Sequence, residues 1–402
     1  MKIKIKKCNR YAVLIILFPI CNLIGGSFSY YDEILGMYSF CYLWTKFASN
    51  QLHPKLRGIM ILLAILSLIS IISNITSGIC NNIFAILIDA LCLWKTFACF
   101  MLASQIFKNN NTGDSIISIL YRPATWMIYI LAGLSIIGQA VNIGVTSQSA
   151  ISGLKAFRFF WNSSVQTGWL IICCIIIIAL SDISKRKFQK YLMVAGIPLM
   201  LTMSSMIYCW IIAMLILFII LKYKNKFKII YIIPIALAVI LFNWEDIQTY
   251  FIDETSSVRI TLIRKGIEVA NRFFPLGAGF ATYGSEMASR YYSKLYVEFG
   301  WGNSWAFKSN SGFLNDAFFA SIVGQFGWIG FVLYLLALYQ LFKMINSSFV
   351  SKRVGVCSIA AFLAICAAMI GSATVKSMMG VCLFFVLGLV NGRILGHSNK
   401  DN

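Results

Sequence analysis

Long apolar runs separated by short polar connections fill almost the whole chain. The runs fall near residues 11–29, 30–48, 57–75, 83–104, 124–143, 163–181, 190–221, 227–243, 313–341, 354–372 and 376–393. A spanning helix needs about 20 apolar residues, so each ordinary run predicts one crossing. The run 190–221 would be about 48 Å long as a single helix, and Pro198 and Thr202 predict a turn near 202–206. The pattern predicts an all-α polytopic membrane protein of about 12 transmembrane helices with one long outer (periplasmic or extracellular) loop.

Basic residues collect in alternate connections between these runs. They cluster at the N-terminus and in 50–57, 105–122, 181–190, 222–228 and 343–353, whereas the connections near 30, 76–82, 144–161 and 373–376 have few. Cytoplasmic loops collect Lys and Arg, so the pattern predicts that both termini are cytoplasmic. The net charge of +20 then reflects sidedness, and no nucleic-acid partner is expected. With 59% hydrophobic and 12% charged residues, a soluble enzyme, a disordered tail and a secreted disulfide scaffold are excluded.

The predicted crossings divide the chain into three parts. Residues 1–243 form transmembrane helices 1–9 with an outer loop near 144–161, and residues 313–402 form helices 10–12 with a short cytoplasmic tail. Between them, 244–312 is a large outer loop expected to carry the active site. It is rich in aromatic residues, which argues against disorder. Such rings pack on the apolar faces of sugars or anchor at lipid headgroups, and composition alone leaves both open.

Arginines on the predicted outer side are candidates for binding an anion. Arg158 lies in an apolar stretch, and Arg259 and Arg264 lie in 256–272, which predicts a short helix. A guanidinium binds phosphate through two hydrogen bonds, although it can also reach toward lipid headgroups. At a spacing of five residues, Arg259 and Arg264 do not share one helix face, so we expect only one to point into a site.

Two outer carboxylates are the best placed general bases. Glu286 lies in the long loop, and Asp316 opens the run 313–341, where a helix cap is the alternative role. Asp89 and Lys95 lie inside one apolar run, six residues apart, so each is expected to pair with a different span. Both histidines, His53 and His397, map to the cytoplasmic side. No metal site and no cofactor are therefore expected.

Several segments resemble the O-antigen ligase/polymerase superfamily, and most closely its Wzy-type polymerases. They are Phe274–Ser285, Tyr291–Tyr296, Phe313–Phe319 and Gly324–Gly327, together with Arg158 followed by Asn162 and Gly168. The resemblance covers roughly 150–345. The chain departs from the family where Ser204-Ser205-Met206 replaces a Ser-Arg pair and where Ser163 replaces a proline.

The resemblance implies a glycosyltransferase that joins undecaprenyl-pyrophosphate-linked oligosaccharide repeats at the outer face of the bacterial inner membrane. Arg158 and Arg259 would neutralise the pyrophosphate leaving group, and Glu286 or Asp316 would be the base. Membrane lipid and a chain-length regulator protein are the implied partners. The expected substrate-binding residues are Arg264, Gly277, Gly279, Tyr283, Ser285, Tyr291, Tyr292, Tyr296, Asn315 and Gln325.

Two alternatives stay open. An O-antigen ligase would resemble the family equally, but the outer-loop histidine shared by those ligases is absent here. A flippase or transporter of the lipid-linked oligosaccharide usually has related halves and broken helices at the membrane midplane. The sequence has no evident internal repeat, and its polar residues concentrate in the outer loop.

Overall fold

The computed structural model describes residues 2–108, 110–151, 153–161, 163–223, 228–242, 244, 248, 258–346 and 351–398. The predicted outer-loop acids Glu245, Asp246, Asp253 and Glu254, and Asn162 of the family resemblance, lie outside the described residues. The first half of the chain contains α1 (Lys2–Ile24), η1 (Gly26–Tyr30), α2 (Tyr31–Ala48), α3 (Pro54–Ser77), α4 (Ile83–Phe107), α5 (Asn110–Ala140), β1 (Thr146–Ile151), β2 (Leu154–Phe157), α6 (Ser164–Leu180), α7 (Lys185–Leu201) and α8 (Ser205–Tyr223). The second half contains η2 (Ile229–Tyr231), α9 (Ile232–Phe242), α11 (Val258–Arg272), α12 (Glu286–Arg290), α13 (Lys294–Glu298), η4 (Trp301–Asn303), η5 (Gly312–Asn315), α14 (Phe318–Asn346), α15 (Lys352–Gly371), η6 (Thr374–Lys376) and α16 (Met378–Ser398).

The chain is a helical membrane protein. Within the described residues, six helices are long and apolar enough to cross a bilayer: Pro54–Ser77, Ile83–Phe107, Gly113–Ala140, Phe318–Asn346, Lys352–Gly371 and Met378–Gly396. Shorter apolar helices cover Arg10–Ile24, Ser164–Leu180, Ser205–Leu221 and Ile232–Leu241. The long run 190–221 is interrupted at Thr202–Ser204, between α7 and α8, where its proline and polar residues predict a turn.

A β-hairpin departs from the all-α prediction. β1 and β2 pair antiparallel in the segment predicted as the outer loop 144–161, with Ala150 opposite Lys155. Gln139, near the end of α5, donates to the carbonyl of Lys155 at 2.7 Å and accepts from its N–H at 2.9 Å. These two bonds attach the hairpin to α5.

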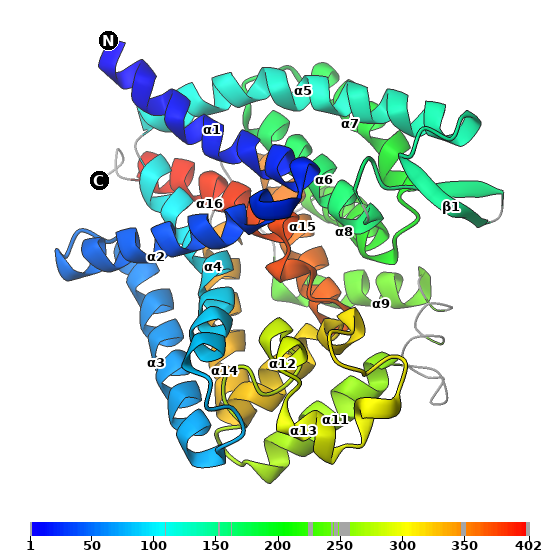
Figure 1. Cartoon of the computed structure of the whole chain (residues 1–402). Helices are drawn as coiled ribbons and strands as arrows, with labels where there is room; N and C mark the ends of the chain where they lie inside the picture. The colour runs from blue at the N-terminus through cyan, green and yellow to red at the C-terminus, as the bar shows by residue number, and fades with distance from the viewer. Residues whose placement is uncertain are drawn as a thin grey trace.

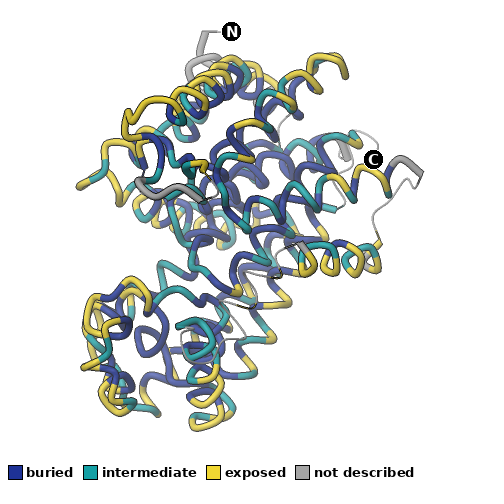
Figure 2. The backbone as a smooth tube through the Cα atoms, turned by 90° about the vertical axis from the view of Figure 1, so that its right-hand side faces the viewer, coloured by how far each residue is buried: buried dark blue, intermediate teal, exposed yellow. Residues whose placement is uncertain are grey.

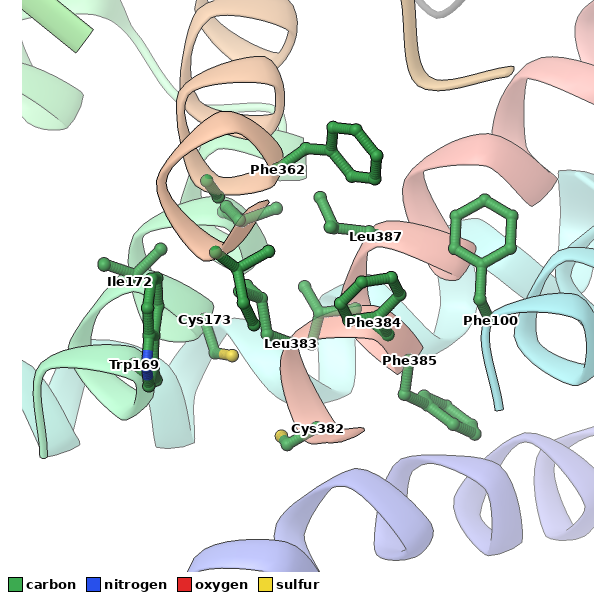
Figure 3. Packing of buried hydrophobic residues seen from close by; sticks show 14 of the residues in the cluster. Phe100, Trp169, Ile172, Cys173, Phe362, Cys382, Leu383, Phe384, Phe385 and Leu387 are labelled. Carbon is green, nitrogen blue, oxygen red and sulfur yellow. The ribbon is translucent and has the colours of Figure 1, made fainter. Parts of the chain in front are cut away.

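The core of the molecule is built around α16. This helix packs against α4, α6, α1 and α5, and Figure 3 shows Leu383, Phe384 and Phe385 between side chains of α4, α6 and α15. All three side chains are fully buried. A helix that is apolar on every side is expected at the centre of a membrane bundle.

Two arginines contact predicted cytoplasmic connections. Arg393, near the end of α16, forms an ion pair with Asp114 of α5 at 3.0 Å. Arg353, at the start of α15, donates to the carbonyls of Ser181 and Ile183 at 2.7 Å each. These contacts join the basic connection 343–353 to 181–190, and the connection 105–122 to the end of α16.

A buried ion cluster joins α2 to α4. Lys95 contacts Asp32 at 2.5 Å and Glu33 at 2.8 Å, which confirms the expectation that it pairs with another apolar run. Gly36 leaves room for this lysine, because a Cβ there would lie 2.5 Å from the Lys95 Cβ. Removing one partner of such a buried pair costs about 3–5 kcal/mol, so the cluster fixes α2 against α4.

Candidate functional site

Helix α14 is folded back on itself. Gly327 has φ 62° and ψ −167°, which breaks the helix into two halves. The rings of Phe318 and Tyr334 lie 5.7 Å apart, and those of Phe319 and Phe331 lie 6.1 Å apart. Along a straight helix, Phe318 and Tyr334 would be about 24 Å apart. The predicted single run 313–341 is therefore wrong as one straight element, because the chain reverses at the glycine.

The glycine-rich loop inserts at this break. The N–H of Ala278 donates to the carbonyl of Gly324 at 3.0 Å, and the N–H of Gly279 donates to that of Gln325 at 2.8 Å. Both carbonyls lie just before Gly327, where the broken helix no longer supplies partners. Two segments that carry the family resemblance thus form a single structural unit.

Helices α3 and α4 hold the same loop from the other side. Asn74 donates to the carbonyl of Phe280 and accepts from its N–H, both at 2.8 Å. Asp89 accepts from the N–H of Ala281 and from the amide of Gln325, both at 2.7 Å. This pairing with other segments is what we expected of an intramembrane carboxylate.

Three predicted substrate-binding residues belong to this packed unit. Gln325 is 2% exposed, and its amide is bound to Asp89. A Cβ on Gly277 would lie 2.3 Å from the Gly327 nitrogen, and a Cβ on Gly279 would lie 2.5 Å from the Asn74 side chain. The glycines let the backbone approach other protein segments, whereas the sequence suggested that they let it approach a ligand.

The segment predicted as the outer loop forms, over its described residues, a small lobe with its own core. α11, α12 and α13 lie beside the ends of α3 and α14, at the bottom of Figure 1, and Figure 2 shows buried residues inside this lobe and exposed residues around it. Its core includes Tyr283, Tyr296, Trp301 and Phe307, with the Trp301 and Phe307 rings stacked at 4.4 Å. The core extends past residue 312 to Ala320, so it crosses the predicted boundary of the outer loop.

The tyrosines predicted to bind sugar divide into buried and exposed groups. Tyr283 and Tyr296 are fully buried, and their hydroxyls bond the Leu262 carbonyl at 2.5 Å and the Gly284 N–H at 2.7 Å. These two rings pack the lobe and present no free face. Burial raises the pKa of both hydroxyls above its ordinary value.

The other predicted residues of this region have separate places. Tyr292 is partly buried, and its hydroxyl has no hydrogen-bond partner among the described residues. Ser285 is the N-cap of α12 and accepts from the N–H of Ala288. Tyr291 stays half exposed.

Two exposed aromatic rings lie outside the set of predicted substrate-binding residues. Trp305 is 71% exposed and Phe313 is 41% exposed, and their rings meet edge to face at 5.4 Å. Phe313 belongs to η5, two residues before Asn315 and three before Asp316. Composition could not separate these free rings from the packed ones, because burial depends on the tertiary fold.

Arg259 lies close enough to Asp316, at the end of η5, for its charge to act on that carboxylate. Burial raises the pKa of the Asp316 carboxyl above its ordinary value, and the charge of nearby Arg259 acts in the opposite direction. The Asn315 side-chain oxygen beside it is buried without a hydrogen-bond partner in the described part of the chain. Asp316 is not the N-cap of the following helix, because it ends η5 and α14 begins at Phe318.

Arg264 lies away from this pair. The buried face of α11 consists of Leu262, Gly266, Val269 and Ala270, and Arg264 is exposed on another face. Arg259, near the start of the helix, is partly buried. Of the two arginines, Arg259 is the one beside the carboxylate.

Arg158 and Glu286 lie on other elements. Arg158 follows β2, and its N–H donates to the Val145 carbonyl at 2.9 Å. Glu286 begins α12, its side chain is 65% exposed, and it lies 3.7 Å from Arg290. The contacts given for the described residues join neither of them to Arg259 and Asp316.

A further cation, which is not among the predicted site residues, lies close to this pair. The Lys376 ammonium lies 4.9 Å from the centre of the Phe318 ring, and Phe318 is two residues after Asp316. Lys376 belongs to the connection 373–376, which was grouped with the outer connections that have few basic residues. A single lysine in a connection that otherwise has no basic residues is the sequence feature that could have identified Lys376 as a candidate.

A groove of about 470 Å³ opens at the other end of α3 and α14. It is lined by Pro54, Lys55, Gly58, Gln340, Lys343 and Met344. The start of α3 and the end of α14 form it, so it belongs to the basic end of the molecule. It is therefore separate from Asp316.

Comparison with known proteins finds no family model and no curated protein that matches the chain. Among the described residues, no group of three or more His, Cys, Asp or Glu side chains could hold a metal ion.

Proposed function

We propose that the chain is a polysaccharide polymerase of the Wzy type that joins undecaprenyl-pyrophosphate-linked oligosaccharide repeats. The observation that carries this proposal is the placement of Arg259 beside Asp316 at the end of η5. The transfer needs a positive group to neutralise the leaving pyrophosphate and a poorly solvated carboxylate to act as the base. The resemblance of the segments Phe274–Ser285 and Gly324–Gly327 to the family, and their contact in the fold, support it further.

The proposed reaction is a direct displacement at an anomeric carbon. A hydroxyl of the acceptor repeat attacks the anomeric carbon of the donor, and the bond from that carbon to the pyrophosphate oxygen breaks. Asp316 accepts the hydroxyl proton, and burial favours this role because a raised pKa makes the carboxylate a stronger base. Arg259 neutralises the negative charge that develops on the departing undecaprenyl pyrophosphate.

The exposed ring pair offers a place for the saccharide. Trp305 and Phe313 present free aromatic surface next to Asn315 and Asp316. The apolar face of an aromatic ring can pack against the C–H groups on one face of a pyranose. In this proposal they hold a sugar of the repeat unit.

The finer topology belongs to the same proposal. About 12 crossings, with both termini cytoplasmic and the segment 244–312 outside, would place Asp316 at the outer face of a bacterial inner membrane. The contact between the basic connections 181–190 and 343–353 supports the prediction that they lie on the same side of the membrane. The product would be O-antigen or capsular polysaccharide.

One observation favours a transporter of the same lipid-linked unit as the second candidate. Broken helices mark substrate sites in many transporters, and α14 is broken at Gly327. Here, however, the break is filled by Ala278 and Gly279 and is packed against α3 and α4. A ligase is the third candidate, and the absent outer histidine speaks against it.

The test is a gel of surface glycolipid from a host that lacks the gene and carries either the wild-type chain or a variant. We expect Arg259→Ala and Asp316→Asn to collapse the long-chain ladder to core plus one repeat, while Arg264→Ala keeps it. Loss of even the single repeat would assign the chain to the ligases or flippases. A normal ladder from both site variants, at wild-type protein levels, would remove Arg259 and Asp316 from the reaction.

A further inference from the structure

Lys376 is held in a fixed position beside the proposed site. Trp169 of α6 donates to the Thr374 hydroxyl at 3.2 Å, and Thr96 of α4 donates to the Val375 carbonyl at 3.2 Å. Gly380 packs against the same turn, where a Cβ would lie 2.2 Å from the Thr374 carbonyl oxygen. The backbone on the N-terminal side of the lysine is therefore anchored to two separate helices.

The charge of Lys376 is not matched by an acid of the described chain. No carboxylate of the described residues forms an ion pair with it, and its contact is the Phe318 ring at 4.9 Å. A cation–π contact contributes about 0.5–1 kcal/mol at an exposed site. The nearby carboxylate of Asp316 has Arg259 as its cationic neighbour. A partly buried ammonium in this state is suited to an anion supplied by a ligand.

We propose that Lys376, which contacts the Phe318 ring, and Arg259, which lies near Asp316, form a two-cation site for the pyrophosphate of the lipid carrier. This inference rests on the proposed function and identifies the second cation of its site. The sequence predicted Arg158 for that role, but Arg158 directly follows β2 of the hairpin. Two separated cations suit a pyrophosphate better than a monophosphate, because each phosphoryl group can then receive its own charge-assisted hydrogen bonds.

The test measures lipid binding by the purified full chain in nanodiscs, using native mass spectrometry. The probes are undecaprenyl pyrophosphate and uncharged undecaprenol. The variants are Lys376→Met, Lys376→Gln, Lys376→Arg and Arg259→Met. Lys308→Met is the matched control, since Lys308 is an exposed lysine of the same lobe. Thermal melts of every variant report on folding.

We expect Lys376→Met and Lys376→Gln to weaken undecaprenyl pyrophosphate binding about tenfold, and Lys376→Arg to keep it within about threefold. Undecaprenol binding and the Lys308→Met variant should match the wild type. Unchanged pyrophosphate binding in both neutral Lys376 variants, with binding lost in Arg259→Met, would overturn this inference and leave the proposed function standing. Equal loss of both lipids would show that Lys376 acts on structure and would also overturn it. Unchanged binding in Arg259→Met as well would overturn the proposed function.

Discussion

Gly277 and Gly327 meet backbone to backbone. A Cβ on Gly277 would lie 2.3 Å from the Gly327 nitrogen, and a Cβ on Gly327 would lie 2.5 Å from the Gly277 nitrogen. Both residues have φ in the left-handed region, at 80° and 62°. Glycine is therefore required twice at this point, once for conformation and once for space.

Replacing Gly327 should destabilise the junction between the lobe and α14. We expect Gly327→Ala to lower the melting temperature and the amount of protein in the membrane, because the left-handed conformation alone costs about 1–3 kcal/mol and the Cβ clash adds to it. Gly302→Ala is the control, since the nearest atom to its Cβ would be the Tyr292 hydroxyl at 3.8 Å. Melts of the purified variants measure the effect, and equal melting temperatures would contradict the packing described for Gly327.

Asp89 should stabilise the fold by accepting two hydrogen bonds. Asp89→Leu leaves the N–H of Ala281 and the amide of Gln325 without this partner, which should cost about 2–6 kcal/mol at about 1–3 kcal/mol for each buried group. Asp89→Asn keeps an acceptor oxygen and should lose much less. Melting temperatures in detergent compare the two. If both variants lowered the melting temperature equally, the negative charge would matter more than the two hydrogen bonds.

The pH dependence of polymerisation should report Asp316. Burial raises the pKa of this carboxyl, and the base is active only when it is ionised, so the rate should fall as the pH drops through a pKa above the ordinary aspartate range. Rates of polymer formation in proteoliposomes against pH provide the measurement. The residual activity of Asp316→Asn should lack this acid limb. An unchanged limb in that variant would assign the titration to another group.

The exposed ring pair should affect substrate affinity more than turnover. We expect Trp305→Ala and Phe313→Ala to raise KM for the oligosaccharide substrate about three- to tenfold, which corresponds to about 0.5–1.5 kcal/mol of ring contact. Phe274→Ala is the control, because Phe274 is equally exposed and lies outside the pair. Steady-state kinetics with a lipid-linked repeat measure the effect. A similar change in all three variants would indicate general contact with lipid.

The sequence predicted the membrane helices and several of their interactions, because these follow from length and local chemistry. The turn before Ser205 was visible from its polar residues, and Lys95 in an apolar run required a partner elsewhere. The reversal at Gly327 was not visible, since the run 313–341 stays apolar throughout. That break depends on Ala278 and Gly279, which lie far away in the sequence.

The candidate site was predicted in part. Arg259 and Asp316 were both named, and the fold brings them together. The glycines, Tyr283 and Tyr296 belong to the same region but serve packing. Residue type alone indicates a possible ligand, whereas burial decides between a ring that packs and a ring that binds. Lys376 lies in another connection, so only the fold relates it to Asp316.

The hydrogen bond from Ala278 to Gly324 affects which parts of the sequence can change during evolution. It closes residues 278–324 into a loop whose two ends are fixed at one point on α14, while the core of the lobe packs mainly on itself. Closing a longer loop adds only a small entropic cost, about 0.6 kcal/mol for each doubling. The exposed stretch of this loop around Trp305 can therefore be lengthened, shortened or exchanged, while Phe280 and Ala281 stay bonded to α3 and α4 and Asp316 stays at the start of α14. Selection could alter sugar preference in this exchangeable part while the part that meets the lipid carrier stays as it is.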